Sequence, residues 1–386
     1  MPAKNRNPML LILRKISGRL IKQVYARIIM ACKLYGLFAA RLVLGRYRRK
    51  IGKRYPSTIQ LPITYKCNFD CIMCGMKSMI NRPGFAPNEL KQILSDALFR
   101  KINAVGLNGG EPFLLNDLEL YVDVLFTTLS KLKNVYIISN GYITNTILEK
   151  SKIILSMCHD HRAKLHLSIS IDGYEGMQDM MRGKKGAFAH AVNTCRQIME
   201  NQSKYCDTFG TICTVTKVNV YHLAELDVWA QQNHIPISYN IATIHKRLCN
   251  ENKYQDFSVF TDEHARLMAA EFFYSKYLET NKEEYFGLYY VIHTGKRIAS
   301  CAHQADVVTL TPNGYLSYCA THSDQIGNAY EEKPEEIFFS RKNISYRNQL
   351  HSKYCMNCSQ YSGSLNPKYY LSKYIKDRMR ATVIYR

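Results

Sequence analysis

Strand-like and helix-like segments alternate along residues 59–245. Short apolar runs rich in β-branched residues are typical of buried strands, and the longer segments between them have apolar positions at helical spacing. The predicted strands are residues 59–65, 103–107, 134–138, 164–171, 210–215 and 235–241. The predicted helices include residues 88–100, 118–131, 187–200 and 221–232. Six such β/α units imply a parallel sheet with right-handed crossovers.

A different pattern follows this repeat. Residues 261–278 have the spacing of a further helix, and two apolar runs, residues 307–310 and 315–318, flank the sequence Thr-Pro-Asn-Gly. Asn-Gly between two apolar runs predicts a β-hairpin. At 386 residues the chain is long enough for two domains and an extension.

The first 54 residues contain fifteen Lys or Arg and no Asp or Glu, in a chain with a net charge of +21. Apolar residues recur at helical spacing over residues 9–47, with basic residues between them. The longest apolar run, residues 34–40, is too short for a membrane span, which needs about twenty residues. We therefore expect a cationic amphipathic helix on an anionic membrane surface, where each basic residue adds ~1 kcal/mol.

Three other interpretations of this segment stay open. It fits a helix that docks on the rest of the protein or on a partner. It fits an organellar presequence, although its low serine content argues against that. It also fits RNA binding, but its basic residues alternate with aliphatic residues and not with aromatic residues for base stacking, so a nucleic-acid partner is not expected.

Three of the thirteen cysteines, Cys67, Cys71 and Cys74, form a C-x3-C-x2-C motif directly after the first predicted strand. Nothing resembles a cleavable secretory signal, so a disulfide framework is not expected. Three thiolates on one loop can hold three corners of a [4Fe–4S] cluster and leave the fourth iron for a ligand that is not protein. The alternatives are a zinc knuckle or unrelated buried thiols, but zinc sites usually show two C-x2-C pairs or Cys/His mixtures.

The second predicted strand leads into Gly109-Gly110-Glu111-Pro112. With the three cysteines, this motif resembles the radical S-adenosylmethionine (radical SAM) superfamily. The resemblance implies that a [4Fe–4S] cluster binds SAM at its open iron and cleaves it reductively to a 5′-deoxyadenosyl radical, which abstracts hydrogen from an unactivated C–H bond. It also implies that Gly109, Gly110 and Glu111 contact the SAM amino group; glycines permit close approach, and a carboxylate accepts hydrogen bonds from an ammonium group.

The resemblance extends to other predicted strand ends. Asn140 and Ser170 follow the third and fourth strands, and Arg182 opens an Arg-Gly-x-x-Gly-x-Phe segment similar to that of peptide-modifying radical SAM enzymes. By resemblance, Asn140 belongs to the cofactor site, Ser170 meets the SAM ribose and Arg182 approaches the SAM carboxylate. Met73 stands where the family often has an aromatic residue near adenine, and a thioether can contact a ring. Asp172 is expected to form a turn.

Four more cysteines form a pattern near the C-terminus: Cys301, Cys319, Cys355 and Cys358. Their spacing resembles the auxiliary-cluster (SPASM) domains of radical SAM enzymes, and because no cysteine follows, it resembles the shortened twitch form with one auxiliary [4Fe–4S] cluster. A four-cysteine zinc ribbon is the alternative. Four thiolates would close the cluster, which suits electron transfer.

Together these features predict a partial (β/α)6 TIM barrel with a small auxiliary-cluster hairpin domain. The predicted parts are residues 1–54 (amphipathic helix), 55–260 (radical SAM core), 261–365 (linker helix and auxiliary domain) and 366–386 (basic tail). The favoured function is a cytoplasmic radical SAM enzyme, peripheral at the inner membrane face and reduced by a flavodoxin or ferredoxin. Its substrate is a sugar, cyclitol or glycan, or alternatively a peptide; the non-enzyme alternative is a zinc-binding membrane or nucleic-acid adaptor.

Overall fold

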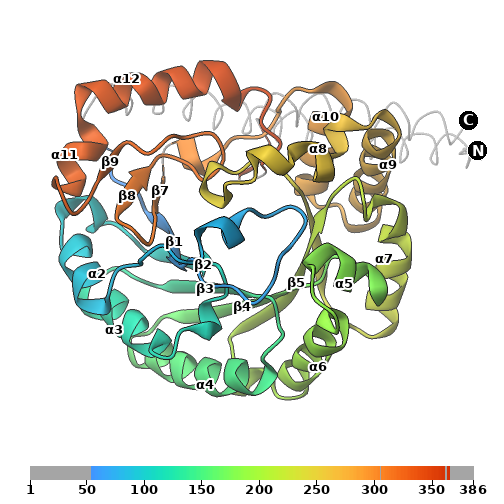
Figure 1. Cartoon of the computed structure of the whole chain (residues 1–386), viewed down its shortest axis with the longest axis horizontal. Coiled ribbons are helices and arrows are strands. Elements are labelled where there is room, and N and C mark those ends of the chain that lie inside the picture. The colour runs from blue at the N-terminus through green and yellow to red at the C-terminus, as the bar shows by residue number, and fades with distance from the viewer. Residues whose placement is uncertain (1–53, 305, 361–362, 366–386) are drawn as a thin grey trace, which may run out of the picture. The chain divides into compact units, whose positions relative to one another are not determined.

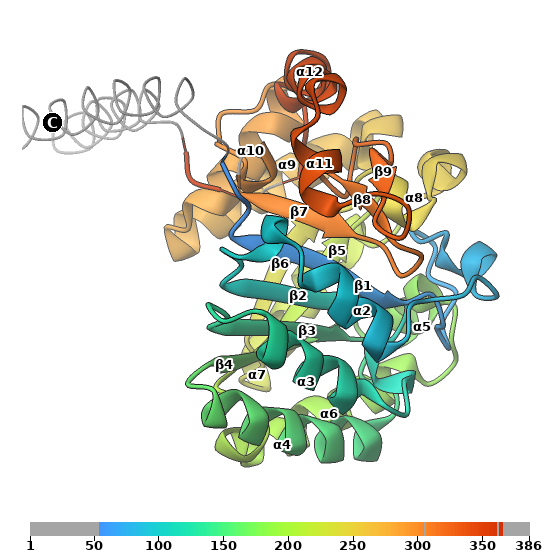
Figure 2. The ribbon, with the colours of Figure 1, turned by 90° about the vertical axis from the view of Figure 1, so that its left-hand side faces the viewer.

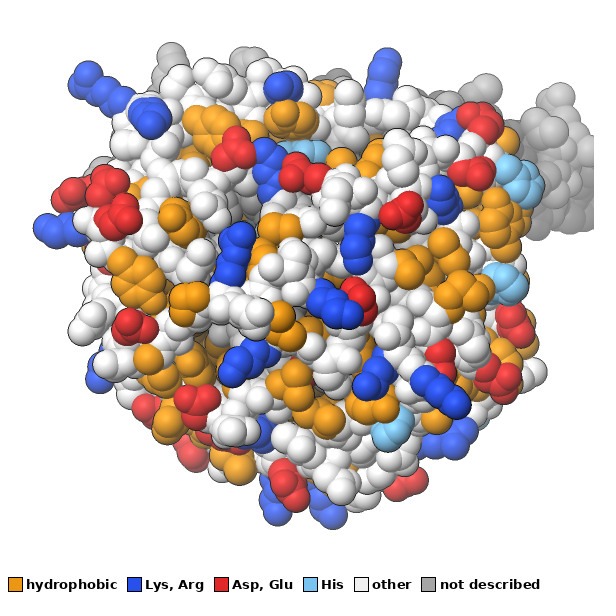
Figure 3. Space-filling view, in the orientation of Figure 1, with side chains coloured by type: hydrophobic (Ala, Val, Ile, Leu, Met, Phe, Trp, Pro, Cys, Tyr) orange, Lys and Arg blue, Asp and Glu red, His pale blue; other side chains and the backbone are white. Residues whose placement is uncertain are grey.

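A computed structural model describes residues 54–304, 306–360 and 363–365. The predicted N-terminal amphipathic helix and the basic C-terminal tail therefore lie outside the described residues, apart from Arg54. Within the described ranges, no helix combines the length and the apolar character that a membrane span requires. On the face shown in Figure 3, basic and acidic side chains are interspersed.

One nine-stranded sheet organises the fold, in the order β6-β5-β4-β3-β2-β1-β7-β8-β9. The strands are β1 (Thr58–Thr64), β2 (Ala104–Gly109), β3 (Asn134–Ser139), β4 (Lys164–Ser170), β5 (Thr208–Val215), β6 (Ile237–Ile241), β7 (Val307–Leu310), β8 (Tyr315–Ser317) and β9 (Gly327–Asn328). Strands β1 to β6 pair in parallel with their chain neighbours. All six predicted strands are present, and the predicted partial barrel is confirmed.

Helices cover the outside of this curved sheet, and others lie above its centre and beside the C-terminal strands (Figure 1). In chain order they are α2 (Pro87–Leu94), α3 (Leu118–Thr128), α4 (Thr144–Asp160), α5 (Gly176–Arg182), α6 (Ala187–Glu200), α7 (Leu223–Gln232), α8 (Tyr254–Phe257), α9 (Glu263–Thr280), α10 (Glu283–Thr294), α11 (Pro334–Phe339) and α12 (Arg341–Leu350). The helix predicted at residues 88–100 ends earlier, at Leu94, because the Asp96 side chain accepts a hydrogen bond from the Leu98 amide and starts a separate 3-10 turn.

The two faces of the barrel sheet differ in exposure. On β3, Val135 and Ile137 are buried against the helices, whereas Tyr136 and Ile138 on the opposite face are 44% and 39% exposed. Side chains of successive strand residues point to opposite faces. The inner face of the partial barrel is therefore accessible, and this leaves room for a ligand at the centre of the fold.

The predicted C-terminal hairpin is present as β7 and β8, with Gly314 at a φ of +85° in the turn. Strand β7 also pairs in parallel with β1, where Thr58 is opposite Val307. Figures 1 and 2 both show the hairpin beside β1. The C-terminal cysteine region thus continues the barrel sheet, which brings it next to the loop that follows β1.

Candidate functional site

The loop that carries Cys67, Cys71 and Cys74 follows β1 and is held from two sides. The Ile72 amide donates to the Met181 carbonyl at 3.0 Å, where α5 ends. On the other side, the Gly75 amide donates to the Leu248 carbonyl at 2.9 Å. Gly75 has no room for a side chain, since a Cβ there would lie 2.1 Å from the carbonyl oxygen of Cys249.

All ten residues predicted for the catalytic cluster and SAM line one cavity of about 390 Å³. They are Cys67, Cys71, Met73, Cys74, Gly109, Gly110, Glu111, Asn140, Ser170 and Arg182. This volume is within the usual range of small-molecule sites. The cavity lies at the carboxyl ends of the parallel strands, which is where barrel enzymes place their active sites. The individual roles of these ten residues in binding a cofactor stay predictions.

The two glycines after β2 let this turn lie against the start of the cysteine loop. A Cβ on Gly110 would lie 2.0 Å from the Lys66 carbonyl oxygen, and Gly109 has a φ of +124°. The Gly110 and Glu111 amides donate to the carbonyls of Thr64 and Lys66, both at 2.8 Å. The absence of a side chain at Gly110 thus lets this turn pack closely against the backbone that precedes Cys67.

The carboxylate of Glu111 joins the ends of β2 and β3. It is fully buried, and it accepts hydrogen bonds from the Ser139 hydroxyl at 2.9 Å and the Asn140 amide at 2.7 Å. Burial raises its pKa to about 7. The Asn140 side chain in turn donates to Asn68 in the cysteine loop at 2.7 Å. Two residues predicted for cofactor binding therefore also fix the cysteine loop to the sheet.

Arg182 and Asp172 form an ion pair of 2.7 Å in which the Asp172 side chain is completely buried. Arg182 also donates toward Cys71 Sγ at 3.8 Å, so its guanidinium group connects the end of β4 with the cysteine loop. From the sequence, Asp172 is interpreted as a turn former at the strand end and not as a catalytic acid, and the ion pair adds a role that this interpretation did not include. The Asp172 carboxylate accepts the Thr214 amide at 2.7 Å and compensates the charge of Arg182.

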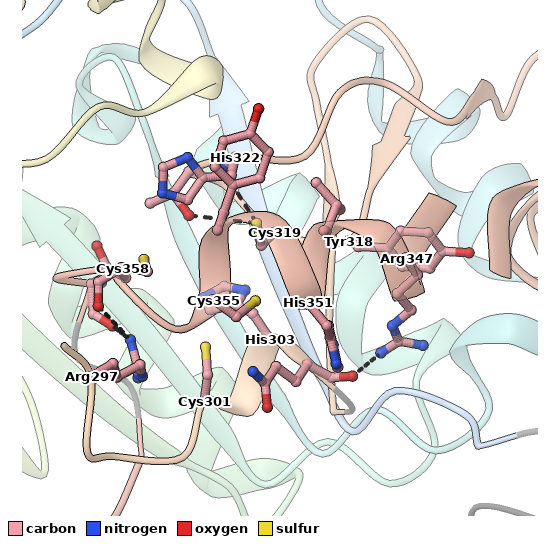
Figure 4. A pocket seen from close by; sticks show the side chains of 15 residues that line it. Arg297, Cys301, His303, Tyr318, Cys319, His322, Arg347, His351, Cys355 and Cys358 are labelled. Carbon is pink, nitrogen blue, oxygen red and sulfur yellow. Dashed lines mark hydrogen bonds between the residues drawn. The ribbon is translucent and has the colours of Figure 1, made fainter. Parts of the chain in front are cut away.

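The four C-terminal cysteines line a second cavity (Figure 4). Cys301 precedes β7, Cys319 follows β8, and Cys355 ends a π-helical turn after α12. The His322 amide donates to Cys319 Sγ at 3.4 Å. Burial raises the pKa of Cys358 to about 11, and a backbone hydrogen bond from Gln360 partly opposes this shift. Arg297 holds the last segment by donating to the Cys358 carbonyl at 3.2 Å.

In the described ranges, no three His, Cys, Asp or Glu side chains converge closely enough to hold one metal ion. Zinc would bind four thiolates at a single ion, whereas a [4Fe–4S] cluster binds each cysteine at a different iron. Metal content therefore distinguishes the two groups at the C-terminal cysteines.

The two cavities adjoin, since His303, Thr321 and Gln360 line both of them. His245 and Arg247, which follow β6, lie on the same wall of the first cavity. No sequence motif marks these residues, because they lie in loops and short 3-10 turns. The only sequence signal for them is their position, either after the end of a predicted strand or close to a C-terminal cysteine.

Comparison with known proteins decides the family. Residues 61–227 match the model of the Radical SAM superfamily. Residues 61–227 therefore form a radical SAM domain. Radical SAM proteins use a [4Fe–4S] cluster and SAM, and the three cysteines at the end of β1 and the cavity beside them fit this pair.

Two curated proteins of Bacillus subtilis are similar to the chain. It is 29% identical over 150 residues to the sporulation killing factor maturation protein SkfB of Bacillus subtilis strain 168, covering 38% of this chain and 33% of SkfB. It is 24% identical over 286 residues to the subtilosin biosynthesis protein AlbA of the same strain, covering 72% of this chain and 58% of AlbA. The chain thus spans from a third to somewhat over half of these relatives.

A solved structure has the same fold. The structure of Streptococcus suis SuiB bound to its precursor peptide SuiA superposes with a TM-score of 0.53 and 14% sequence identity. The match covers 80% of this chain and 70% of SuiB. It therefore includes more of the chain than the family model does.

Proposed function

We propose that this protein is a radical SAM enzyme that modifies a peptide. The observation that carries the proposal is the convergence of all ten predicted cluster and SAM residues on one cavity, which adjoins a second cavity lined by four cysteines. A [4Fe–4S] cluster with SAM, when bound, would supply the radical chemistry that removes hydrogen from an unactivated C–H bond.

The chain's own residues bind and orient these groups. Cys67, Cys71 and Cys74 would hold the catalytic cluster through three irons. The backbone of Gly109 and Gly110 would approach SAM from the end of β2. Each of these residues is positioned by the sheet or by the contacts of the cysteine loop, so the cavity is held in shape by the fold itself.

In the same cavity, Ser170 would meet the SAM ribose and Met73 of the cysteine loop would pack near the adenine ring. The Arg182 charge is shared between Asp172 and Cys71. If Arg182 also binds the SAM carboxylate, as predicted, that carboxylate would be the third partner of the same guanidinium group.

The second cavity would hold an auxiliary cluster closed by Cys301, Cys319, Cys355 and Cys358. Because its four ligands are all protein thiolates, it suits passage of an electron to or from the neighbouring cavity. His303, Thr321 and Gln360 form the short partition between the two sites. The first electron would come from a separate reductant such as flavodoxin or ferredoxin.

A peptide is favoured over a sugar or cyclitol by the relatives. SkfB is named for maturation of the sporulation killing factor, AlbA is named for biosynthesis of the bacteriocin subtilosin, and the SuiB structure contains a precursor peptide. The Arg182 to Phe188 segment favours the same substrate class.

The experiment uses anaerobically reconstituted protein with SAM, dithionite and short peptides encoded beside its gene, followed by mass spectrometry. A peptide whose mass changes by loss of hydrogen, or which acquires a cross-link, with the wild type and not with C67A/C71A/C74A supports the proposal. If SAM is cleaved but no peptide is altered while a cyclitol or sugar is oxidised, the substrate assignment is wrong.

A further inference from the structure

One cation on the wall of the catalytic cavity has no carboxylate partner among the described residues. Three Lys or Arg side chains line this cavity: Lys77, Arg182 and Arg247. Lys77 pairs with Asp70 at 2.8 Å and Arg182 pairs with Asp172 at 2.7 Å. In the described ranges Arg247 forms no ion pair, although it projects from the segment after β6 into the same space.

The contacts of Arg247 hold its guanidinium group in place without neutralising it. Arg247 Nη1 donates to the side-chain oxygen of Asn108, and Arg247 Nε is buried without a hydrogen-bond partner in the described structure. The amide nitrogen of Asn108 donates to Gln60 Oε1 at 3.0 Å and to the Gly106 carbonyl at 3.3 Å. This fixes the Asn108 amide so that its oxygen faces Arg247.

No carboxylate among the described residues of the cavity wall supplies the missing negative charge, and the group that interacts electrostatically with Arg247 is the Cys74 thiol. The acidic residues that line the cavity are Asp70 and Glu111. Asp70 pairs with Lys77, and the oxygens of Glu111 accept hydrogen bonds from Ser139 and Asn140. Burial lowers the pKa of Arg247 to about 10, so Arg247 remains protonated at neutral pH. A charge held away from water without a partner is costly, and a carboxylate is the planar acceptor that suits a guanidinium group.

We propose that Arg247 is a carboxylate-binding residue of the catalytic cavity. The carboxylate has two possible sources, the methionine part of SAM or an acidic group of the substrate. The inference rests on the proposed function only in the choice of SAM and the substrate as the sources of the carboxylate. Arg182 already pairs with Asp172, whereas Arg247 has no carboxylate partner among the described residues. Arg247 is therefore the cavity cation that is best placed to bind the carboxylate of a ligand.

The test measures equilibrium binding to anaerobically reconstituted protein without a reductant. The first pair of ligands is SAM and its carboxamide, in which an uncharged amide replaces the carboxylate while the amino and sulfonium groups are kept. The second pair is N-acetylaspartate N-methylamide and its uncharged asparagine counterpart. Arg247→Gln should weaken binding of the carboxylate ligand in each pair by about tenfold or more. It should leave the affinity for the uncharged ligand of the pair unchanged. Arg247→Lys should lose less, because it keeps the charge and loses only the fork geometry.

The surface variant Arg196→Gln serves as the control, and equal iron content in all variants shows that the site is intact. If Arg247→Gln loses its iron, Arg247→Lys carries the comparison. Weaker binding of SAM alone assigns the carboxylate to SAM, and weaker binding of the aspartate derivative alone assigns it to the substrate. Unchanged binding of both carboxylates, or equal weakening of charged and neutral ligands, overturns the inference. Failure of SAM cleavage in the wild type would bear on the proposed function and not on these binding ratios.

Discussion

Asp172 Oδ2 lies 2.7 Å from Arg182 Nη2, in a pair where Asp172 is completely buried and the Arg182 side chain is 11% exposed. The same arginine donates toward Cys71 Sγ at 3.8 Å. The end of β4 is thereby connected to a cysteine of the predicted catalytic cluster by one guanidinium group. This connection makes the cysteine loop dependent on a carboxylate one hundred residues further along the chain.

Replacing Asp172 should therefore destabilise the protein strongly. Asp172→Asn leaves Arg182 buried without a counter-charge, which costs about 3–5 kcal/mol. The measurement is urea unfolding of anaerobically reconstituted protein at neutral pH. The matched control is Glu336→Gln, which removes an exposed ion pair with Lys333 at 3.9 Å and should cost about 1 kcal/mol or less. Equal effects of the two variants would show that the buried pair does not hold the loop.

A methyl group at Gly110 should displace the cysteine loop. The added Cβ would lie 2.0 Å from the Lys66 carbonyl oxygen, directly before Cys67. We expect Gly110→Ala to lose about half of the protein's iron, because the catalytic cluster would no longer fit while the second site is untouched. Gly176→Ala is the control, since nothing lies within 4 Å of a Cβ at that helical position. Full iron content in Gly110→Ala would contradict the close packing described here.

Metal content distinguishes an auxiliary cluster from a zinc ribbon. Reconstituted wild-type protein should contain about eight irons per chain, as two [4Fe–4S] clusters, and C67A/C71A/C74A should contain about four. Elemental analysis with the ultraviolet–visible spectrum measures both. One equivalent of zinc together with about four irons in the wild type would assign Cys301, Cys319, Cys355 and Cys358 to zinc.

The strands and the three cysteine-loop ligands could be predicted because each depends on local sequence. Apolar runs specify buried strands, and a short loop keeps Cys67, Cys71 and Cys74 close in any fold. The role of Asp172 could not be predicted in this way, since its partner Arg182 comes from the next helix. Arg247 was missed for the same reason: its environment is created by Asn108, more than a hundred residues away.

The hairpin illustrates an intermediate case. The Asn-Gly turn predicted β7 and β8, but it gave no information about which strand β7 would meet. Parallel pairing of β7 with β1 joins segments about 250 residues apart, and it is this long-range pairing that places the second cavity beside the first.

The N-terminal segment gives a separate prediction, because residues 1–53 lie outside the described structure. From its charge and periodicity we expect full-length protein to co-sediment with anionic vesicles at low salt, and salt should weaken this by screening. A truncation that begins at Arg54 keeps the Arg54–Asp306 pair of 2.6 Å. It should lose vesicle binding and still cleave SAM. Full-length protein that ignores anionic vesicles, or a truncated protein that unfolds, would show that the segment docks on the fold instead.

The central claim is that Cys67, Cys71 and Cys74 hold a cluster that cleaves SAM in the cavity beside them. The most direct measurement is formation of 5′-deoxyadenosine from SAM and dithionite, followed by liquid chromatography under strict exclusion of oxygen. The wild type should produce it, and C67A/C71A/C74A, with its C-terminal cysteines intact, should produce none above the protein-free background. Equal production by the triple variant would contradict the assignment of the catalytic site.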